Sequence, residues 1–344
     1  DLAPSPHILV ELAALLGREF DAELLLAAVP LADASSLEAL ETLRIRQILE
    51  EAPGDRLRFV HDKLRENAYA NIPPERCRLL HRRAAEAIEH RYTRERDRVQ
   101  FYPSLAQHWA KAQVHDQASR YFGLAGDHAR AAHANNEAIL FYREALAELR
   151  EHLRDGGEPQ AWQPSLLHFH ESLGDLLALT GKAEEARAAY DEVLARLAAE
   201  DRLRRARVHR KQGKTWEAHH RHEEALRAYD EAEAALGQAP EERGELRPED
   251  SAWWQEWVQL QVDPNWIYYW LGRVEAMSML VERVRHVVET KGTPLQLARF
   301  FQSLIPMTLR REPYRVSDEL VEYGRRGVEA SRAFGELPAK GMGR

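Results

Sequence analysis

Two segments of this sequence repeat each other at a fixed spacing. Residues 173–194 read LGDLLALTGKAEEARAAYDEVL, and residues 212–233 read QGKTWEAHHRHEEALRAYDEAE. Four positions correspond at a displacement of 39 residues: Gly174 and Gly213, Gly181 and His220, Ala186 and Ala225, Tyr190 and Tyr229. A period of this length predicts a stacked array of helical pairs, because each pair covers its apolar face only by packing on its neighbours.

Each unit combines small and large side chains on two packed helices. The first glycine allows the first helix to approach its neighbour closely, and the alanine gives the second helix a small contact surface. The tyrosine lies four residues after the alanine and therefore on the same helix face. The pattern resembles the tetratricopeptide repeat, whose period is about 34 residues. We therefore expect a tetratricopeptide-like solenoid. Its expected function is to bind a partner, not to catalyse a reaction.

Weaker copies flank the two matched units. Ala118 and Ala138 both start a second-helix pattern, yet they lie only 20 residues apart. Because this spacing is too short for a full unit, we expect a single helix over about 116–133 to serve both neighbours. Downstream, Gly272 occupies the position that Gly181 has in the better matched unit. At least four helical pairs are expected.

The first ninety residues follow a different pattern. Apolar spacing predicts three helices, over 6–16, 22–28 and 37–48. Two short strands are then expected on either side of Pro53-Gly54-Asp55, which is a tight-turn sequence. Three helices followed by a β-hairpin are the components of a winged helix. The predicted fold class is therefore all-α, with a helical solenoid preceded by a small winged-helix domain.

The segment after the hairpin carries a resemblance to a known family. Residues 58–69 read RFVHDKLRENAY, and they resemble the end of the winged-helix domain in the STAND class of signal-transduction ATPases. In that class a hydrophobic-His-Asp motif follows the last strand, and here it is Val60-His61-Asp62. Residues 73–92 resemble the helix that joins this domain to the repeats in bacterial, MalT-like STAND proteins. The resemblance extends over nearly the whole chain.

The resemblance implies a non-catalytic regulatory arm of a larger signal-transduction ATPase. Such an arm is a sensor that binds a protein, a peptide or a small inducer on its repeats and acts on an upstream nucleotide-binding module. ATP or ADP would belong to that module, and no cofactor is expected in this chain. In the intact parent, His61 would contact the phosphates of ADP and Asp62 would position it. The residues themselves also predict a simpler role, in which Asp62 caps a helix starting at Lys63.

No catalytic or metal-binding constellation stands out. Gly213-Lys214-Thr215 matches the end of a phosphate-binding loop, but Val208 replaces the required first glycine and the segment lies within a helical repeat. The carboxylates alternate with arginines, as solvated ion pairs do on helix faces. The densest histidine group, 219, 220 and 222, lacks accompanying cysteine or His-Glu-x-x-His ligands. We therefore expect no enzyme activity, no metal site and an inert Cys77.

Charge argues against nucleic-acid binding by the N-terminal module. Residues 1–92 contain 12 basic and 16 acidic side chains, so their net charge is 12 − 16 = −4. Phosphate binding needs concentrated positive charge, whereas the third predicted helix sets only Arg44 and Arg46 against Glu38 and Glu41. A winged-helix DNA-binding regulator thus remains only an alternative. A second alternative is a free-standing peptide-binding scaffold without any ATPase.

Five of the eight tryptophans lie within the eighteen residues 253–270. Trp253 and Trp257 are four residues apart, as are Trp266 and Trp270, so each pair forms one stripe on a helix. Such stripes are typical of core packing between repeats, while other members of the cluster can line a binding groove. The candidate partner-binding residues are Trp254, Trp257, Trp266, Tyr268 and Tyr269.

Composition supplies the remaining expectations. No apolar run approaches the roughly 20 residues of a membrane span, and no signal peptide is present, so a cytoplasmic protein without membrane contact is expected. Seven of the 48 basic residues are lysine, which suggests a bacterial genome rich in GC. The chain begins without methionine, which suggests a fragment. The predicted segments are a winged helix (1–72), a connecting helix (73–100), repeats (101–236), a linker (237–250) and further repeats with the aromatic cluster (251–344).

Overall fold

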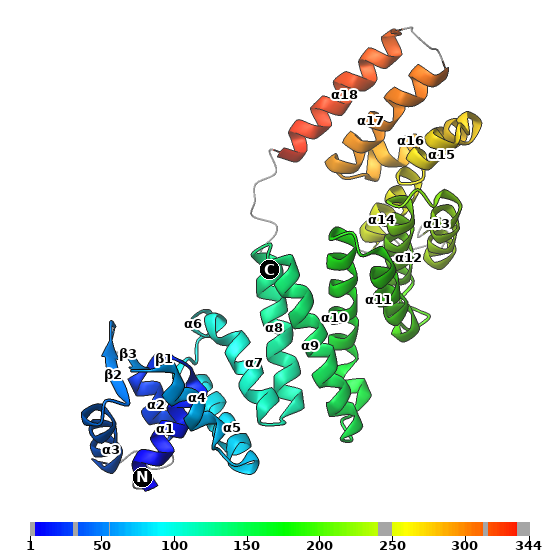
Figure 1. Cartoon of the computed structure of the whole chain (residues 1–344). Helices are drawn as coiled ribbons and strands as arrows, with labels where there is room; N and C mark the ends of the chain where they lie inside the picture. The colour runs from blue at the N-terminus through cyan, green and yellow to red at the C-terminus, as the bar shows by residue number, and fades with distance from the viewer. Residues whose placement is uncertain (1–3, 30–33, 55, 240–249, 312–315, 336–344) are drawn as a thin grey trace. The chain divides into compact units, whose positions relative to one another are not determined.

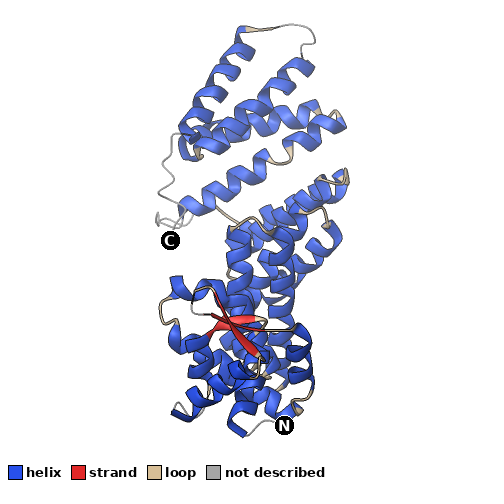
Figure 2. Ribbon diagram, turned by 60° about the vertical axis from the view of Figure 1, so that its left-hand side comes forward, coloured by secondary structure: helices blue, strands red, loops and turns tan. Residues whose placement is uncertain are grey.

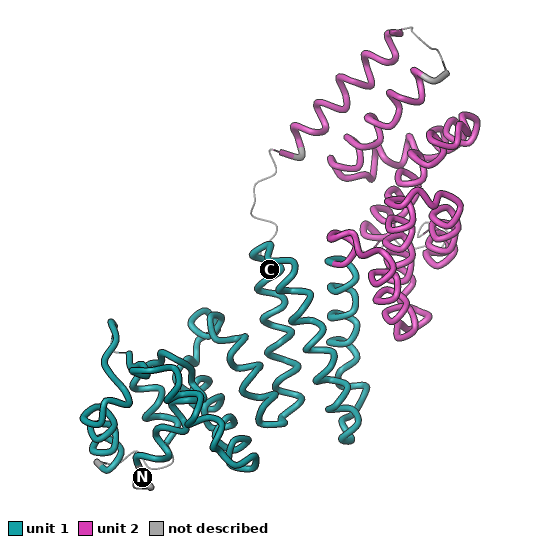
Figure 3. The backbone as a smooth tube through the Cα atoms, viewed as in Figure 1, with its two compact units in different colours: residues 1–176 teal, residues 177–344 magenta. Residues whose placement is uncertain are grey.

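The computed structural model describes residues 4–29, 34–54, 56–239, 250–311 and 316–335 of the 344-residue chain. Within these ranges the protein is helical apart from one small sheet (Figures 1 and 2). The chain divides into two compact units, residues 1–176 and residues 177–344 (Figure 3). The predicted fold class, a helical array preceded by a small module that contains a β-hairpin, is confirmed.

The N-terminal module alternates helices and short strands. Its elements are α1 (Pro4–Leu16), β1 (Glu19–Asp21), α2 (Ala22–Ala28), α3 (Ala34–Ile45), β2 (Leu49–Ala52) and β3 (Arg56–Phe59). The described strands form an antiparallel sheet in the order β1-β3-β2 (Figure 2). Asp21 ends β1 and caps α2, because its side chain accepts hydrogen bonds from the backbone N–H groups of Glu23 and Leu24. The hairpin β2–β3 is therefore as predicted, whereas β1 was not predicted from the sequence.

The remaining elements of the first unit are helical. They are α4 (Asp62–Ala70), α5 (Pro74–Arg91), α6 (Glu95–Arg98), a 3₁₀ turn (Val99–Phe101), α7 (Tyr102–Lys111), α8 (His115–Ala131), α9 (Asn135–Arg154) and α10 (Pro159–Leu179), which extends into the second unit. Helix α8 packs against both α7 and α9 (Figure 1). One helix thus serves both neighbours, as the short spacing between Ala118 and Ala138 predicts.

The second unit contains α11 to α18. Their bounds are α11 (Ala183–Arg196), α12 (Arg202–Glu217), α13 (His222–Leu236), α14 (Asp250–Val262), α15 (Asn265–Leu271), α16 (Val274–Lys291), α17 (Pro294–Arg311) and α18 (Asp318–Gly335). One apolar cluster joins α12 and α13 to α14 and α15, and a second joins α14 to α16, α17 and α18. Most of the predicted linker, residues 240–249, lies outside the described residues.

The same turn recurs between helices in the described part of the chain. Each turn has one residue in the left-handed region, and the next residue donates its backbone N–H to the carbonyl five positions earlier. This is the pattern of a Schellman cap. The left-handed residues are Gln113, His133, Gly156, Gly181, His220 and Gly272. Gly181 and His220 are the pair that the 39-residue displacement relates, so the turn explains why both positions end a first helix.

The small residues of the repeat are buried where the packing is tightest. Ala186 and Ala225 have no exposed surface, as predicted, and Tyr190 and Tyr229 are almost fully buried beside them. A Cβ atom built on Gly213 would lie 2.6 Å from the ring of Tyr229. Glycine is therefore required there for close approach of α12 and α13.

None of the helices in the described ranges combines the length and the hydropathy that a bilayer crossing requires.

Candidate functional sites

The His-Asp motif lies at the junction between the sheet and α4. β3 ends at Phe59 and α4 begins at Asp62, so His61 is the last extended residue before the helix. Both His61 and Asp62 are exposed. Asp62 lies in the first helical turn, where its carboxylate is 3.3 Å from the Nε of Arg18. The motif is therefore accessible on the surface of the first unit.

The prediction that Asp62 caps a helix starting at Lys63 is wrong. Asp62 is itself the first residue of α4, and the capping position belongs to His61. No side-chain capping hydrogen bond is found at this helix start within the described residues. A carboxylate in the first turn still interacts favourably with the helix dipole. The Asp62 side chain points to Arg18 and not to the backbone N–H groups. For this reason it does not cap the helix.

The predicted aromatic residues separate into a packed group and an exposed group. Trp254 packs against the apolar cluster of α12 to α15, and Trp257 and Tyr268 pack against both clusters of the second unit. Arg283 lies 5.5 Å from the centre of the Trp257 ring, and Lys291 lies 4.0 Å from that of Trp254. Cations over indole faces stabilise such packing. These three candidates hold helices together.

The exposed group lies on α15. Trp266 and Trp270 are 43% and 64% exposed. The ring of Tyr269 is half-buried against the second apolar cluster and contacts both tryptophans, with centroids 5.7 and 5.4 Å away. We call Trp266, Tyr269 and Trp270 the α15 aromatic patch. The interpretation of Trp266 and Trp270 as a core stripe is therefore wrong. Trp270 was not among the predicted partner-binding residues, although its spacing from Trp266 already placed the two side chains together.

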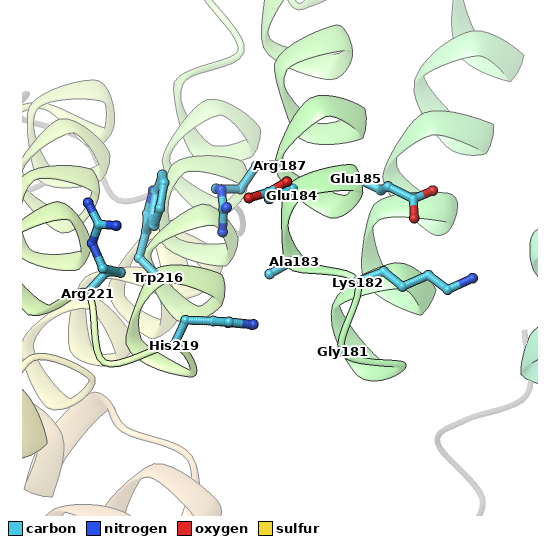
Figure 4. A pocket seen from close by; sticks show the side chains of 9 residues that line it. All are labelled: Gly181, Lys182, Ala183, Glu184, Glu185, Arg187, Trp216, His219 and Arg221. Carbon is cyan, nitrogen blue, oxygen red and sulfur yellow. The ribbon is translucent and has the colours of Figure 1, made fainter.

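A pocket of about 480 Å³ lies between the turns that precede α11 and α13. Its walls include Gly181, Arg187, Trp216, His219 and Arg221 (Figure 4). The Arg187 guanidinium lies 3.5 Å from the centre of the Trp216 ring and donates a hydrogen bond to Thr215 Oγ1 at 3.2 Å. Desolvation lowers the pKa of Arg187, although a guanidinium remains charged. The sequence did not indicate this stack, because nothing in the repeat links Arg187 to Trp216.

Figure 4 also shows how the charges around this pocket are arranged. Glu184 lies beside Arg187, whereas Lys182 and Glu185 point away from Trp216. Arg221 pairs with Glu224, and the carbonyl of Thr215 lies 3.1 Å from His219 Nδ1. The described contacts thus pair Arg221 with a carboxylate of its own repeat and hold Arg187 against Trp216 and Thr215. This arrangement favours a structural role for the stack.

A polar network is buried between α12 and α14. Arg210 contacts Glu256 at 2.5 Å and Asp263 at 3.3 Å, and Lys214 contacts Asp263 and Glu217, each at 3.0 Å. Desolvation disfavours the charged ammonium of Lys214, but the two carboxylates outweigh it and raise its pKa. The charges are therefore paired, so none is available as a general acid or base. In the described ranges, no three His, Cys, Asp or Glu side chains are arranged to hold a metal ion.

Comparison with known proteins assigns no family. No protein-family model matches the sequence, and no curated protein matches it either. The structure is similar to BtubC (BKLC) from P. vanneervenii, with 16% identity and a TM-score of 0.46 over 77% of this chain and 94% of that one. It is also similar to a STAND protein with a tetratricopeptide repeat sensor from Pyrococcus horikoshii. That comparison has 11% identity and a TM-score of 0.43, and covers 98% of this chain and 45% of the other. Neither similarity decides a function.

Proposed function

We propose that this chain is a non-catalytic interaction arm that binds a protein or peptide partner through the α15 aromatic patch. The observation that carries the proposal is the exposure of two tryptophans, Trp266 and Trp270, around the ring of Tyr269. Isolated exposed apolar residues are common on protein surfaces, but adjacent exposed aromatic side chains are not. Tryptophan and tyrosine are also enriched among the residues that dominate binding energy at protein interfaces.

Neighbouring ion pairs support α15 as a rigid platform. Arg273, which follows the turn after α15, lies 2.7 Å from Glu223 on α13. Ile267, on another face of α15, is fully buried in the cluster shared with α12 to α14. The helix is therefore anchored on one side and presents aromatic rings on the other. A preorganised surface of this kind loses little conformational entropy when it binds.

The parent protein in this proposal is a STAND-type signal-transduction ATPase of the bacterial, MalT-like kind. The N-terminal helices and the β1-β3-β2 sheet would be its winged-helix domain, and α5 the connecting helix to the repeats. His61 would contact ADP bound by an upstream module, with Asp62 as its positioning partner. The exposure of both side chains supports this role, since a contact with another module needs an accessible motif. The five predicted segments keep their boundaries in this proposal.

The alternative of a DNA-binding regulator has less support. Arg44, at the end of α3, contacts Glu41 at 3.0 Å and Glu51 at 2.6 Å. A basic side chain paired with two carboxylates is poorly placed to bind phosphate. A free-standing peptide-binding scaffold would use the same α15 aromatic patch. It differs from the main proposal only in lacking a nucleotide-binding module.

The experiment that tests partner binding starts from peptides selected on the whole chain by phage display. We expect a selected peptide to bind saturably, and the double variant Trp266→Ala/Trp270→Ala to weaken its binding by about thirtyfold or more. Calorimetric titration of purified protein gives the affinities. Leu179→Ala is the matched control, because Leu179 is a large exposed apolar residue (72%) on α10.

The control variant should bind the selected peptide as tightly as the unmodified protein does. Circular dichroism should show the same helicity for all variants, since the substituted side chains are exposed. A selection that yields no saturable binder contradicts the proposal. Equal affinity of the selected peptides for the double variant and for the unmodified chain also contradicts the proposal.

A further inference from the structure

The first unit contains a second site that the α15 aromatic patch does not include. A cavity of about 900 Å³ lies where the N-terminal module meets the first repeat helices. The end of α1, one face of α4 and His81 of α5 line it from the N-terminal side, and α7, α8 and α9 line it from the repeat side. This volume falls within the range of roughly 300–1,000 Å³ that is typical of small-molecule sites. The cavity is large enough for an organic ligand.

Much of the cavity wall is apolar. Leu15 and Leu16 from α1 face Phe122 from α8 and Phe141 from α9. Leu140, also on α9, lines the cavity although it is 58% exposed. A large apolar side chain gains free energy when a ligand covers it, at about 25 cal/mol per Å² of buried surface. These residues favour a ligand with a hydrocarbon body.

One edge of the cavity is cationic. Arg65 reaches it from α4 and Lys111 from the end of α7. The Nε of Arg65 is buried and has no hydrogen-bond partner among the described residues. An unsatisfied buried N–H of a charged group costs free energy, which an acceptor on a ligand would recover. On α9 the carboxylate of Glu148 is already paired with His115, at 2.7 Å.

Two buried histidines add a directional hydrogen-bond donor. Cys77 Sγ donates to the Tyr69 hydroxyl, which lies 3.1 Å from His81 Nε2, and His81 Nδ1 lies 2.8 Å from His108 Nδ1. Burial lowers the pKa of His81 to about 3 and that of His108 to about 4, so both rings are neutral at pH 7. If Tyr69 donates to His81, then His81 donates to His108. His108 is one of the residues that line the cavity, and its Nε2 then carries the proton.

We infer that this cavity binds a small amphipathic carboxylate, with its head at Arg65 and Lys111 and its hydrocarbon body against the phenylalanines and leucines. The proton on Nε2 makes His108 a further hydrogen-bond donor in the cavity wall. Glu144 also lines the cavity from α9, and its charge repels a carboxylate from that part of the wall, which favours a head at Arg65 and Lys111.

Binding here would act on α4 directly. Arg65 lies one helical turn after His61-Asp62, on the helix that this motif begins. A ligand held between Arg65 on α4 and Lys111 on α7 would therefore connect the repeats to the motif helix. This site does not depend on partner binding by the α15 aromatic patch, which belongs to the other unit.

The test uses decanoate as the probe, with 1-decanol as its uncharged counterpart. We expect decanoate to bind the full chain with one-to-one stoichiometry below about 1 mM, and 1-decanol to bind at least tenfold more weakly. Arg65→Gln should weaken the binding of decanoate by about tenfold to a hundredfold. Leu140→Gln should weaken it by about threefold to tenfold, because the exposed leucine contributes apolar contact only. Arg150→Gln, an exposed arginine on the same helix as Leu140, is the matched control.

Hydrogen exchange then locates the ligand. Decanoate should slow amide exchange in peptides from 62–70 and 102–111 and leave those from 265–271 unchanged. The assignment fails if decanoate does not saturate, if 1-decanol binds equally well, or if Leu140→Gln and Arg65→Gln bind like Arg150→Gln. Should Arg65→Gln unfold, Lys111→Gln replaces it, because Lys111 is exposed. Failure here leaves the peptide-binding test unaffected, since no peptide-site residue is changed.

Discussion

Position 213 requires glycine because the ring of Tyr229 occupies the space in which a Cβ atom would lie. The Tyr229 hydroxyl donates to Glu217 at 2.7 Å, which fixes the ring in place. Gly126 and Tyr142 form the same contact in the first unit, where a Cβ atom would lie 2.8 Å from the ring. Close packing of glycine on tyrosine is therefore a recurring feature of the two units.

Gly213→Ala is expected to destabilise the second unit by about 1 to 3 kcal/mol, because the buried Tyr229 ring must move. Gly324→Ala in α18 is the control, since a Cβ atom there would meet nothing within 4 Å among the described residues. That control should raise stability by about 0.5 to 1 kcal/mol through helix propensity alone. Thermal unfolding followed by circular dichroism measures both. Equal midpoints for the two variants would contradict the glycine–tyrosine contact.

At the residue scale, the sequence predicted contacts within a repeat but not contacts between distant helices. Ala225 and Tyr229 lie on one helix face, so their burial follows from spacing. His81 and His108 are 27 residues apart on different helices, and no local pattern pairs them. The exposure of Trp266 and Trp270 was also not predictable, because a stripe defines a helix face but not whether another helix covers it.

At the scale of elements, the network between α12 and α14 joins two helices through buried charges. The side chains of Glu256 and Asp263 are only 6% and 5% exposed, so each depends on its cationic partner. Arg207, Arg210 and Lys214 lie on one face of α12, spaced three and four residues apart. Their alignment with α14 joins elements on either side of residues 240–249.

Arg210→Leu should cost about 3 to 5 kcal/mol, since it leaves the buried Glu256 carboxylate without its main partner. The double variant Arg210→Leu/Glu256→Leu should cost less than the single variant, because one of those carboxylates is removed as well. Urea unfolding of the single and double variants gives the coupling between the two positions. If the losses in the free energy of unfolding are additive, the Arg210–Glu256 pair is not coupled in the folded protein.

The short elements were the least predictable from sequence. Two strands were predicted because Pro53-Gly54-Asp55 forms a recognisable turn between them. β1 has only three residues, too few for an alternating pattern to be detected, and its pairing with β3 joins residues 35 to 39 positions apart. The spacing of Trp266 and Trp270 indicated a helix at α15, but the aromatic composition, which suits strands and helices alike, did not indicate its bounds.

At the scale of the whole molecule, the proposed sites lie in different units. The small-molecule cavity and the His61-Asp62 motif belong to residues 1–176, and the α15 aromatic patch belongs to residues 177–344. Each site can therefore be altered without touching the other. The sequence indicated the aromatic cluster and the motif, but not the cavity, which six helices form together.

The isolated chain is expected to show no saturable ADP binding. Gly213-Lys214-Thr215 lies within helix α12, where the backbone N–H groups are already used by the helix. In an intact STAND-type parent, His61→Ala should raise basal signalling by about tenfold to a hundredfold, because a charge-assisted hydrogen bond to ADP is lost. Calorimetric titration of this chain with ADP is the direct check. Micromolar binding that disappears in His61→Ala would place a complete nucleotide site here and refute the proposed role.

Helix α8 also determines how the first unit opens. Because α7 and α9 both pack on it, unravelling α8 would expose both neighbours at once. In an array of separate helical pairs, each pair can fray by itself at the cost of one interface. Here the backbone amides from 102 to 154 should instead exchange with solvent in one cooperative step, with a common free energy of opening. The shared helix thus makes three consecutive helices behave as a single folding unit.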